Sequence, residues 1–253
     1  MAGDETILRT EGLTKDFRGF VAVKGVSLRV RRGTIHALIG PNGAGKTTCF
    51  NLLTKFLVPS GGTIFYNGRD ITGQKPADIA KLGMVRSFQI SSVFPNLTAL
   101  ENVRVALQAK THGRSFDFWR SHRVLERLHP RALELLTQVG LEGVADVVAG
   151  ELSYGRKRAL EIATTLALEP ELILLDEPTA GMGHEDVGRI AALIKKVAAG
   201  RTVLMVEHNL SIVASLSDYI TVLARGEILA EGDYAKVSND PAVREAYMGS
   251  ADA

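Results

Sequence analysis

The sequence predicts an α/β fold with parallel core strands, a β-rich N-terminal region and a helical insertion in the middle of the chain. Three observations support this prediction. Residues 7–71 contain short strand-like runs separated by glycine-rich turns, such as "AVKGVSLRV" and "SGGTIFYNGRDI". Residues 93–160 change to helical spacing. The last third alternates helical segments with continuous apolar runs, among them "ELILLDEP" and "RTVLMVEH", which are typical of buried parallel strands.

Composition limits the classes of protein to consider. The chain has 253 residues and 45% hydrophobic composition, enough for one large domain or two subdomains. Its 30 basic residues nearly balance 28 acidic ones, so charge gives no reason to expect a nucleic-acid partner. The N-terminus "MAGDETILRT" lacks the apolar stretch of a signal peptide, and no apolar run approaches the roughly 18 residues that cross a bilayer. We therefore expect a cytoplasmic chain with no membrane-inserted segment.

Two helices are predicted from their end signals. The stretch "HPRALELLTQVG" has Pro130 near its start and Gly140 at its end, with Leu133, Leu136 and Val139 expected on one face. The stretch "ELSYGRKRALEIATTLA" reads as a helix whose N-cap is Ser153.

The second helix has cations where a helix dipole repels them. Arg156, Lys157 and Arg158 occupy its first turn, although acidic residues are favoured there. Either these side chains are simply solvated, or the helix end is built to meet an anion that the chain does not supply.

A phosphate-binding loop is the strongest single motif. The stretch "GPNGAGKTT" follows a predicted strand, precedes a helix and matches G-x-x-x-x-G-K-[ST] in full. Gly43 and Gly45 let backbone N–H groups approach phosphate oxygens, Lys46 reaches the β- and γ-phosphates, and the Thr47 hydroxyl is suited to Mg²⁺. The expected phosphate-binding residues are Gly40, Pro41, Asn42, Gly43, Ala44, Gly45, Lys46, Thr47 and Thr48.

Two carboxylates complete this predicted site. Asp176 ends the apolar run "LILL" and suits Mg²⁺ coordination, while the adjacent Glu177 suits the role of general base toward an attacking water. A third strand runs into Glu207 and His208. Because ligands bind beyond the carboxyl ends of parallel strands, we expect these ends to share one site. The sequence lacks the N-K-x-D motif that reads guanine, which argues against a GTPase.

The stretch "LSYGRKR" followed by "LILLDEPTAGM" resembles the ATP-binding cassette (ABC) family, whose signature is L-S-G-G-Q. The resemblance covers nearly the whole chain. It implies a P-loop NTPase fold with a mostly parallel core sheet, an N-terminal antiparallel β subdomain and a helical insertion. It also implies one ABC nucleotide-binding domain over 1–253, with 1–92 and 161–253 as the α/β core and 93–160 as a helical subdomain. ATP and Mg²⁺ are the implied ligands.

The resemblance also answers the question of the cations. In this family two cassettes pair head to tail, and the signature helix of one faces the γ-phosphate held by the other. Ser153, Tyr154, Gly155 and Arg156 are then expected to contact the partner's ATP. Tyr154 and Arg156 depart from the consensus Gly and Gln, and Arg156 either contacts phosphate or ribose or only raises the local potential. In the segment after Glu177, Gly183 stands where the family usually has an acidic residue.

Other roles are carried over by the same resemblance. Phe17 matches the aromatic residue that stacks on adenine, with Val23 nearby and Phe20 as the alternative. Gln89 in "RSFQI" matches the glutamine that touches Mg²⁺ and the attacking water. His208 matches the switch histidine that holds the γ-phosphate.

Within the family, "LSYG", "VEHNL" and the ending "AEGDYAKVSNDPAVREAYMG" look like the ATPases of branched-chain amino-acid importers. This implies an energy-coupling ATPase held at the inner face of the cell membrane by integral permease subunits. The cassette that pairs with it is then either a paralogue or a second copy of the same chain. The alternatives are a urea or amide importer, a lipopolysaccharide exporter, a soluble ABC protein of DNA repair or translation, and a nucleotide-binding scaffold without turnover. The sequence does not name the solute.

An aromatic cluster lies in the insertion. Phe116, Phe118 and Trp119 occur within "SFDFWRS" at 115–121. They either pack inside the insertion or contact the membrane subunits, which this part faces in the family.

Overall fold

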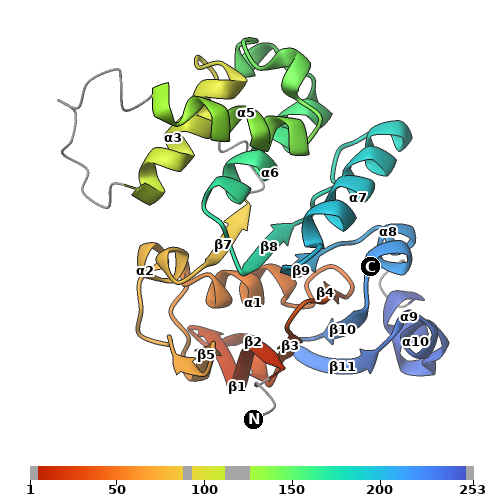
Figure 1. Ribbon diagram of the computed structural model, residues 1–253. Helices are drawn as coiled ribbons and strands as arrows, with labels where there is room; N and C mark the ends of the chain where they lie inside the picture. Colours follow the sequence, from red (N-terminus) through yellow and green to blue (C-terminus); the bar gives the residue numbers. More distant parts are fainter. Residues whose placement is uncertain (1–4, 88–92, 112–125, 249–253) are drawn as a thin grey trace.

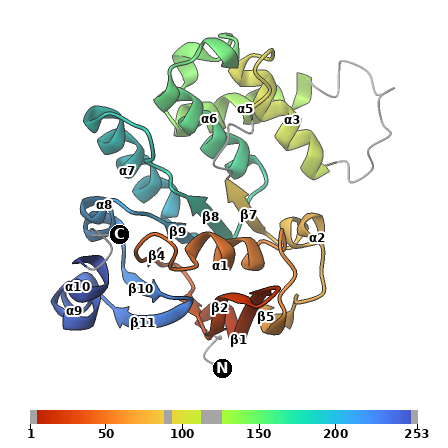
Figure 2. The same cartoon turned by 180° about the vertical axis from the view of Figure 1, so that it is seen from behind.

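The structure, a computed structural model, describes residues 5–87, 93–111 and 126–248. Two sheets enclose one central helix, and a group of helices lies beyond the edge of the larger sheet (Figure 1). The reverse view shows the same arrangement, with the helix between the sheets again visible (Figure 2).

The larger sheet has six strands in the order β11-β10-β4-β9-β8-β7. Their bounds are β4 Ile35–Ile39, β7 Met84–Ser87, β8 Leu172–Asp176, β9 Thr202–Val206, β10 Tyr219–Ala224 and β11 Glu227–Gly232. All neighbours pair in parallel except β10 and β11. Strands β4, β8 and β9 are buried at every residue, as their continuous apolar runs predict. The predicted mostly parallel core sheet is confirmed.

The N-terminal sheet is antiparallel, as predicted. It runs β2-β1-β5-β6, with β3 also paired to β1. The bounds are β1 Thr6–Phe17, β2 Phe20–Val26, β3 Arg29–Arg31, β5 Gly61–Tyr66 and β6 Arg69–Asp70. Helix α1 (Lys46–Leu53) packs against this sheet and the core sheet through buried Phe50 and Cys49. Burial raises the pKa of the Cys49 thiol to about 12.

The remaining elements cover the core sheet or form the helical region. Their bounds are α2 Pro76–Lys81, α3 Ala99–Thr111, α5 His129–Gln138, η1 Glu142–Val144, η2 Ala149–Glu151, α6 Tyr154–Ala167, α7 His184–Ala198, α8 Leu210–Leu216, α9 Tyr234–Asn239 and α10 Pro241–Met248. Among the described residues, none of these helices combines the length and apolar character needed to cross a membrane.

Helix α5 confirms one predicted helix and corrects its buried face. Pro130 lies in its first turn, and Gly140 follows its end at φ +75°. Leu136 and Val139 are buried as expected, but Leu133 is 38% exposed. The core instead receives Ala132 and Leu135 with them, because i, i+3, i+4 and i+7 share a helix face.

Helix α6 joins the helical region to the core sheet. It is continuous through residue 160, where the sequence predicted the end of the helical subdomain. Its buried Leu160 and Ala163 belong to one apolar cluster that also contains Val103 of α3 and Ile173 of β8. The division of the chain at this residue stays a prediction, and it falls inside one helix.

A buried histidine gives the fold a pH dependence. His36 on β4 is 1% exposed, and its Nε2 lies 2.8 Å from the Thr221 hydroxyl. Burial, with a smaller contribution from Arg31, lowers its pKa from 6.5 to about 4. Between about pH 4 and pH 6.5 this histidine therefore binds a proton in the unfolded chain but not in the folded one. The free energy of unfolding therefore decreases as the pH is lowered through this range.

We expect a loss of about 2 kcal/mol from this group between pH 7.5 and pH 5. Urea unfolding at both pH values measures it. In His36→Gln the pH dependence is expected to be shallower by that amount. An equal dependence in both proteins would contradict the assignment to His36.

Candidate nucleotide-binding site

The order of the core strands brings the predicted motifs together. Strands β4, β9 and β8 are neighbours and run in parallel, so their carboxyl ends meet at one edge of the sheet. Gly40 follows β4, Asp176 ends β8, and Glu207 follows β9. The strand ends that carry the predicted residues therefore lie side by side at the edge where parallel sheets bind ligands.

At two positions of the loop before α1, Gly40 and Gly45, the surrounding atoms leave no space for a side chain. A Cβ on Gly40 would lie 2.1 Å from the carbonyl oxygen of Leu223, and one on Gly45 would lie 2.4 Å from that of Ala22. Both glycines also have positive φ, +149° and +96°. These positions allow the loop to curl tightly, as a phosphate cradle requires.

Lys46 is the first residue of α1, and its side chain folds back to the loop. Its Nζ donates hydrogen bonds to the carbonyl oxygens of Gly40 at 2.7 Å and Pro41 at 2.9 Å. Burial lowers the pKa of Lys46, and the charge of Glu177 opposes that shift. Elsewhere in the loop and in the first turn of α1, the exposed residues are Asn42, Gly43 and Thr47, Ala44 is buried, and Thr48 is half-buried.

Asp176 is buried at the end of β8 and has a cationic partner. Its Oδ2 accepts a hydrogen bond from Nη2 of Arg86, and these two side chains are 2% and 10% exposed. The hydroxyl of Thr47 and the Asp176 carboxylate provide oxygen donors only, which suits a hard cation such as Mg²⁺. No group of three or more metal-ligating His, Cys, Asp or Glu side chains occurs in the described ranges.

Glu177 has an unusual backbone. It takes φ +45°, in the left-handed region that residues other than glycine rarely adopt. Its N–H donates to the carbonyl oxygen of Val206 at 2.9 Å, which ties it to β9. Such strain persists where the surrounding structure holds it, and it concentrates at functional sites.

Glu207 organises the loop that carries His208. It is fully buried, and its carboxylate accepts hydrogen bonds from the hydroxyl and N–H of Thr179. It also accepts from the N–H groups of His208 at 2.8 Å and Asn209 at 3.0 Å. The His208 side chain itself is 61% exposed. Glu207 therefore fixes the backbone at the end of β9 while the imidazole stays accessible.

The start of α6 lies near α7. Ser153 is its N-cap residue and is exposed. The hydroxyl of Tyr154, a half-exposed side chain, donates to the carbonyl oxygen of Ala180 at 3.2 Å. A Cβ on Gly155 would lie 2.9 Å from the carboxylate of Asp186. The chain thus supplies one carboxylate beside this helix end.

The three cations of this turn have different surroundings. Arg156 is exposed. Lys157 is half-buried, and its Nζ donates to the carbonyl oxygen of Gly150 at 2.8 Å. Arg158 is buried, so the interpretation of a solvated side chain is wrong for this residue.

Arg158 connects α6 to the loop after β8. Its Nη1 pairs with Glu161 at 2.6 Å. Its Nη2 donates to the carbonyl oxygens of Asp176 at 3.0 Å and Glu177 at 3.5 Å, and its Nε donates to that of Pro178 at 3.3 Å. The guanidinium therefore holds the backbone around both predicted catalytic carboxylates.

The predicted base-stacking residues lie in the hairpin between β1 and β2. Phe17 and Phe20 are cross-strand partners and are 43% and 69% exposed. The Lys15 ammonium lies 5.2 Å from the centre of the Phe17 ring. Val23 has no exposed surface and belongs to the core below α1. Val23 is therefore a core residue and not a nucleotide contact.

Two predictions fall outside the described residues: Gln89, and the aromatic cluster at 115–121. The sequence did not point to Arg86, and it did not predict the buried structural roles of Arg158 and Glu207. The position of Glu207 at a strand end was the only available signal for it.

A family model described as ABC transporter matches residues 23–180, more than half of the chain. The chain belongs to the ABC transporter ATP-binding family. The predicted resemblance is therefore confirmed, and with it an ATPase that binds nucleotide. A second model, described as branched-chain amino acid ATP-binding cassette transporter, matches residues 227–253.

Curated relatives of this ABC chain match along almost their whole length. It is 39% identical to the high-affinity branched-chain amino acid transport ATP-binding protein BraF of Pseudomonas aeruginosa, covering 97% of this chain and 98% of that protein. It is 36% identical to the corresponding protein LivG of Escherichia coli, covering 98% and 99%.

Solved ABC cassettes share the fold. The ADP conformation of an ATP-binding cassette of an ABC transporter has a TM-score of 0.84 and 33% identity, covering 97% of this chain and 100% of that one. A dimeric post-hydrolysis cassette bound to ADP and Pi has a TM-score of 0.75 and 28% identity, covering 89% and 98%.

Proposed function

We propose that this chain is the ATP-hydrolysing, energy-coupling subunit of an importer for branched-chain amino acids. The observation that carries the proposal is the match of the C-terminal residues 227–253 to a model of that transporter branch. The nearly full-length similarity to BraF and LivG supports it.

The main predicted phosphate-binding and catalytic residues receive the following roles in this proposal. Lys46 and the loop N–H groups hold the β- and γ-phosphates, helped by the positive end of α1. Thr47, Asp176 and Gln89 would hold Mg²⁺, which would supply positive charge to the phosphates. Glu177 takes a proton from the attacking water, and His208 holds the γ-phosphate. The exposed imidazole, on a backbone fixed by Glu207, suits that last role.

Phe17 is proposed to stack on the adenine. We expect Phe17→Ala to weaken nucleotide binding by about 5- to 150-fold, since base–aromatic stacking is worth about 1–3 kcal/mol. Calorimetric titration with ATP measures this, and Phe20→Ala tests the alternative residue of the same hairpin. An unchanged dissociation constant in Phe17→Ala would remove the stacking role from Phe17.

A second cassette is the proposed partner at the start of α6. Ser153, Tyr154, Gly155 and Arg156 would face its nucleotide, and this face of the helix is accessible at Ser153 and Arg156. The dimeric cassette among the structural neighbours supports this arrangement. Gly183 also lies toward this face, at the N-cap of α7. A Cβ there would meet no described atom within 4 Å, so space inside the chain does not require glycine.

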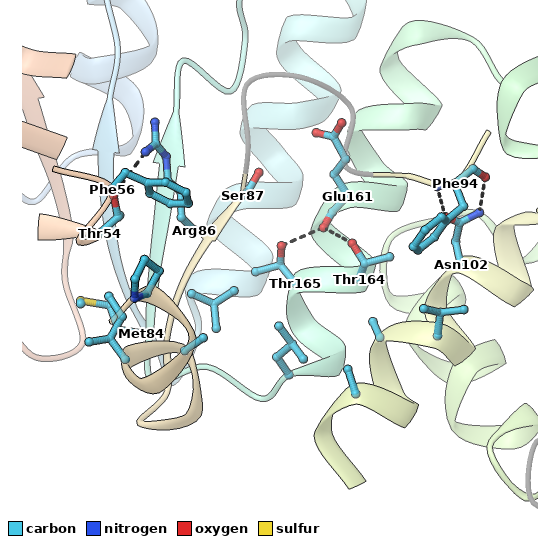
Figure 3. A pocket seen from close by; sticks show the side chains of 18 residues that line it. Thr54, Phe56, Met84, Arg86, Ser87, Phe94, Asn102, Glu161, Thr164 and Thr165 are labelled. Carbon is cyan, nitrogen blue, oxygen red and sulfur yellow. Dashed lines mark hydrogen bonds between the residues drawn. The ribbon is translucent and has the colours of Figure 1, made fainter. Parts of the chain in front are cut away.

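Integral permease subunits are the proposed partners on the helical side. A groove of about 310 Å³ opens between α2 and β7 on one side and α3 and α6 on the other. Figure 3 shows Phe56 and Arg86 on one wall and Phe94 on the other. Phe56 and Phe94 are 51% and 54% exposed, and exposed aromatics in a concave surface favour a protein partner. Such contacts would hold the chain peripherally at the inner face of the membrane.

Purification from the membranes of the source cell tests this function. We expect a tagged chain to bring integral membrane subunits and a second ATP-binding subunit with it. Vesicles containing the complex should take up leucine in an ATP-dependent manner, with urea and aliphatic amides as control solutes. Transport of urea or amides instead would favour the related importers. Absence of a membrane partner would favour a soluble ABC protein.

A further inference from the structure

Arg86 connects two parts of the molecule that the proposed function treats separately. It lies on β7, between the groove of Figure 3 and the end of β8. Its guanidinium pairs with the buried carboxylate of Asp176. The same side chain lines the groove.

The guanidinium is held from several sides. Its Nη1 donates to Oδ1 of Asn51 at 2.6 Å and to the hydroxyl of Thr54 at 3.2 Å, while its Nη2 donates to Asp176. Asn51 belongs to α1, the helix that begins at the phosphate loop. A forked, planar donor can serve these acceptors together, and a lysine ammonium cannot reproduce that geometry.

Aromatic rings flank the guanidinium on the way to the groove. The centre of the buried Phe50 ring lies 5.1 Å from Cζ of Arg86, and that of the exposed Phe56 ring lies 5.6 Å from it. Phe56 also lines the groove. Phe56 therefore lies both at the groove and beside the residue that pairs with Asp176.

We propose that Arg86 is a positioning residue for the metal-binding carboxylate, and that occupation of the groove acts on the metal site through it. This rests on the proposed function, which takes Asp176 as a ligand of Mg²⁺. Arg86 engages Oδ2 of Asp176 and fixes the plane of the carboxylate, which leaves Oδ1 for the cation. Groups that orient metal ligands typically change metal affinity 10- to 100-fold when they are removed.

The test measures Mg²⁺ dependence separately from nucleotide binding. A non-hydrolysable ATP analogue is titrated by calorimetry, first in EDTA and then at increasing Mg²⁺. In Arg86→Met we expect the Mg²⁺ concentration at half-effect to rise about 10- to 100-fold. Binding in EDTA should stay within about twofold, because the hydrogen bonds of Arg86 described above go to Asn51, Thr54 and Asp176 and not to the residues proposed to hold the phosphates. The Mg²⁺ concentration at half-effect in Arg86→Lys should lie between those of the unmodified chain and of Arg86→Met.

Matched controls separate this role from general effects. Arg131→Met removes a half-buried arginine that pairs with Glu134 at 2.7 Å on α5, and it should leave both titrations unchanged. Phe56→Ala should raise the Mg²⁺ half-effect several-fold, since it removes the ring that covers the guanidinium from the groove. Val58→Ala, at an exposed position outside the groove, should not.

Two results would overturn the inference alone: an unchanged Mg²⁺ half-effect in Arg86→Met, or an equal loss of binding with and without Mg²⁺. If Arg86→Met does not fold, Arg86→Lys and Phe56→Ala decide in the same way. An unshifted Phe56→Ala overturns the link to the groove. Absence of any Mg²⁺ effect in the unmodified chain would instead overturn the metal role in the proposed function, and this inference with it.

Discussion

Replacement of Glu177 by glutamine is expected to lower ATP hydrolysis by about 10²–10⁴-fold, the usual contribution of a general base. Glutamine keeps the size and hydrogen-bonding capacity of the side chain but accepts no proton at neutral pH. ATP binding should persist, because the phosphate loop and Lys46 are untouched. Phosphate release under saturating ATP and Mg²⁺ measures the loss. Glu142→Gln, at an exposed position in the helical region, is the matched control. Near-normal hydrolysis in Glu177→Gln would refute the assignment of the base.

Binding without turnover has a consequence for assembly. Each ATP would remain between one phosphate loop and the Ser153 end of a second chain, if the chain pairs with itself. We expect Glu177→Gln to form a dimer in ATP and Mg²⁺, detected by light scattering. Adding Ser153→Arg should prevent that dimer by placing bulk and charge where the phosphate docks. A dimer that survives this second change would refute the proposed interface.

Replacement of Lys46 by alanine is expected to weaken ATP binding by at least about 100-fold. Hydrogen bonds to charged groups contribute about 1.5–3 kcal/mol each, and Lys46 is placed to make two of them to phosphates. In the structure its ammonium bonds to the loop carbonyls of Gly40 and Pro41, so it already lies inside the cradle. Calorimetric titration with ATP measures the loss.

Lys195→Ala is the control for that experiment. Lys195 is exposed near the end of α7, so its removal changes the net charge equally without touching the loop. Equal affinities of Lys46→Ala and Lys195→Ala would contradict the assignment of the cradle.

The sequence predicted the parts of the site whose residues are contiguous. The phosphate loop, the carboxylates after β8 and the N-cap of α6 each lie within one short stretch, and local chemistry specifies them. The parallel sheet followed from continuous apolar runs, and neighbouring strands then brought these stretches together.

The contacts that the sequence did not predict join residues far apart in the chain. Arg86 meets a carboxylate 90 positions away, and Arg158 meets carbonyl groups 18 to 20 positions away. Neither contact has a local pattern, since a lone arginine in a sequence looks the same whether it is solvated or buried. Val23 was misplaced for a related reason: nearness to Phe17 in the chain does not show which face of the strand a side chain occupies.

The buried Arg158 ties the beginning of α6 to the backbone after β8 by hydrogen bonds, so we expect these two parts to move together. In a head-to-tail pair, the first of these would touch the neighbour's ATP and the second would act on the chain's own ATP. A displacement caused by one nucleotide would then be transmitted to the other through Arg158, which lies five positions after Ser153. The two hydrolysis events of such a pair would be mechanically linked through a single side chain in each protomer. The rate of hydrolysis at one site would then depend on the nucleotide bound at the other.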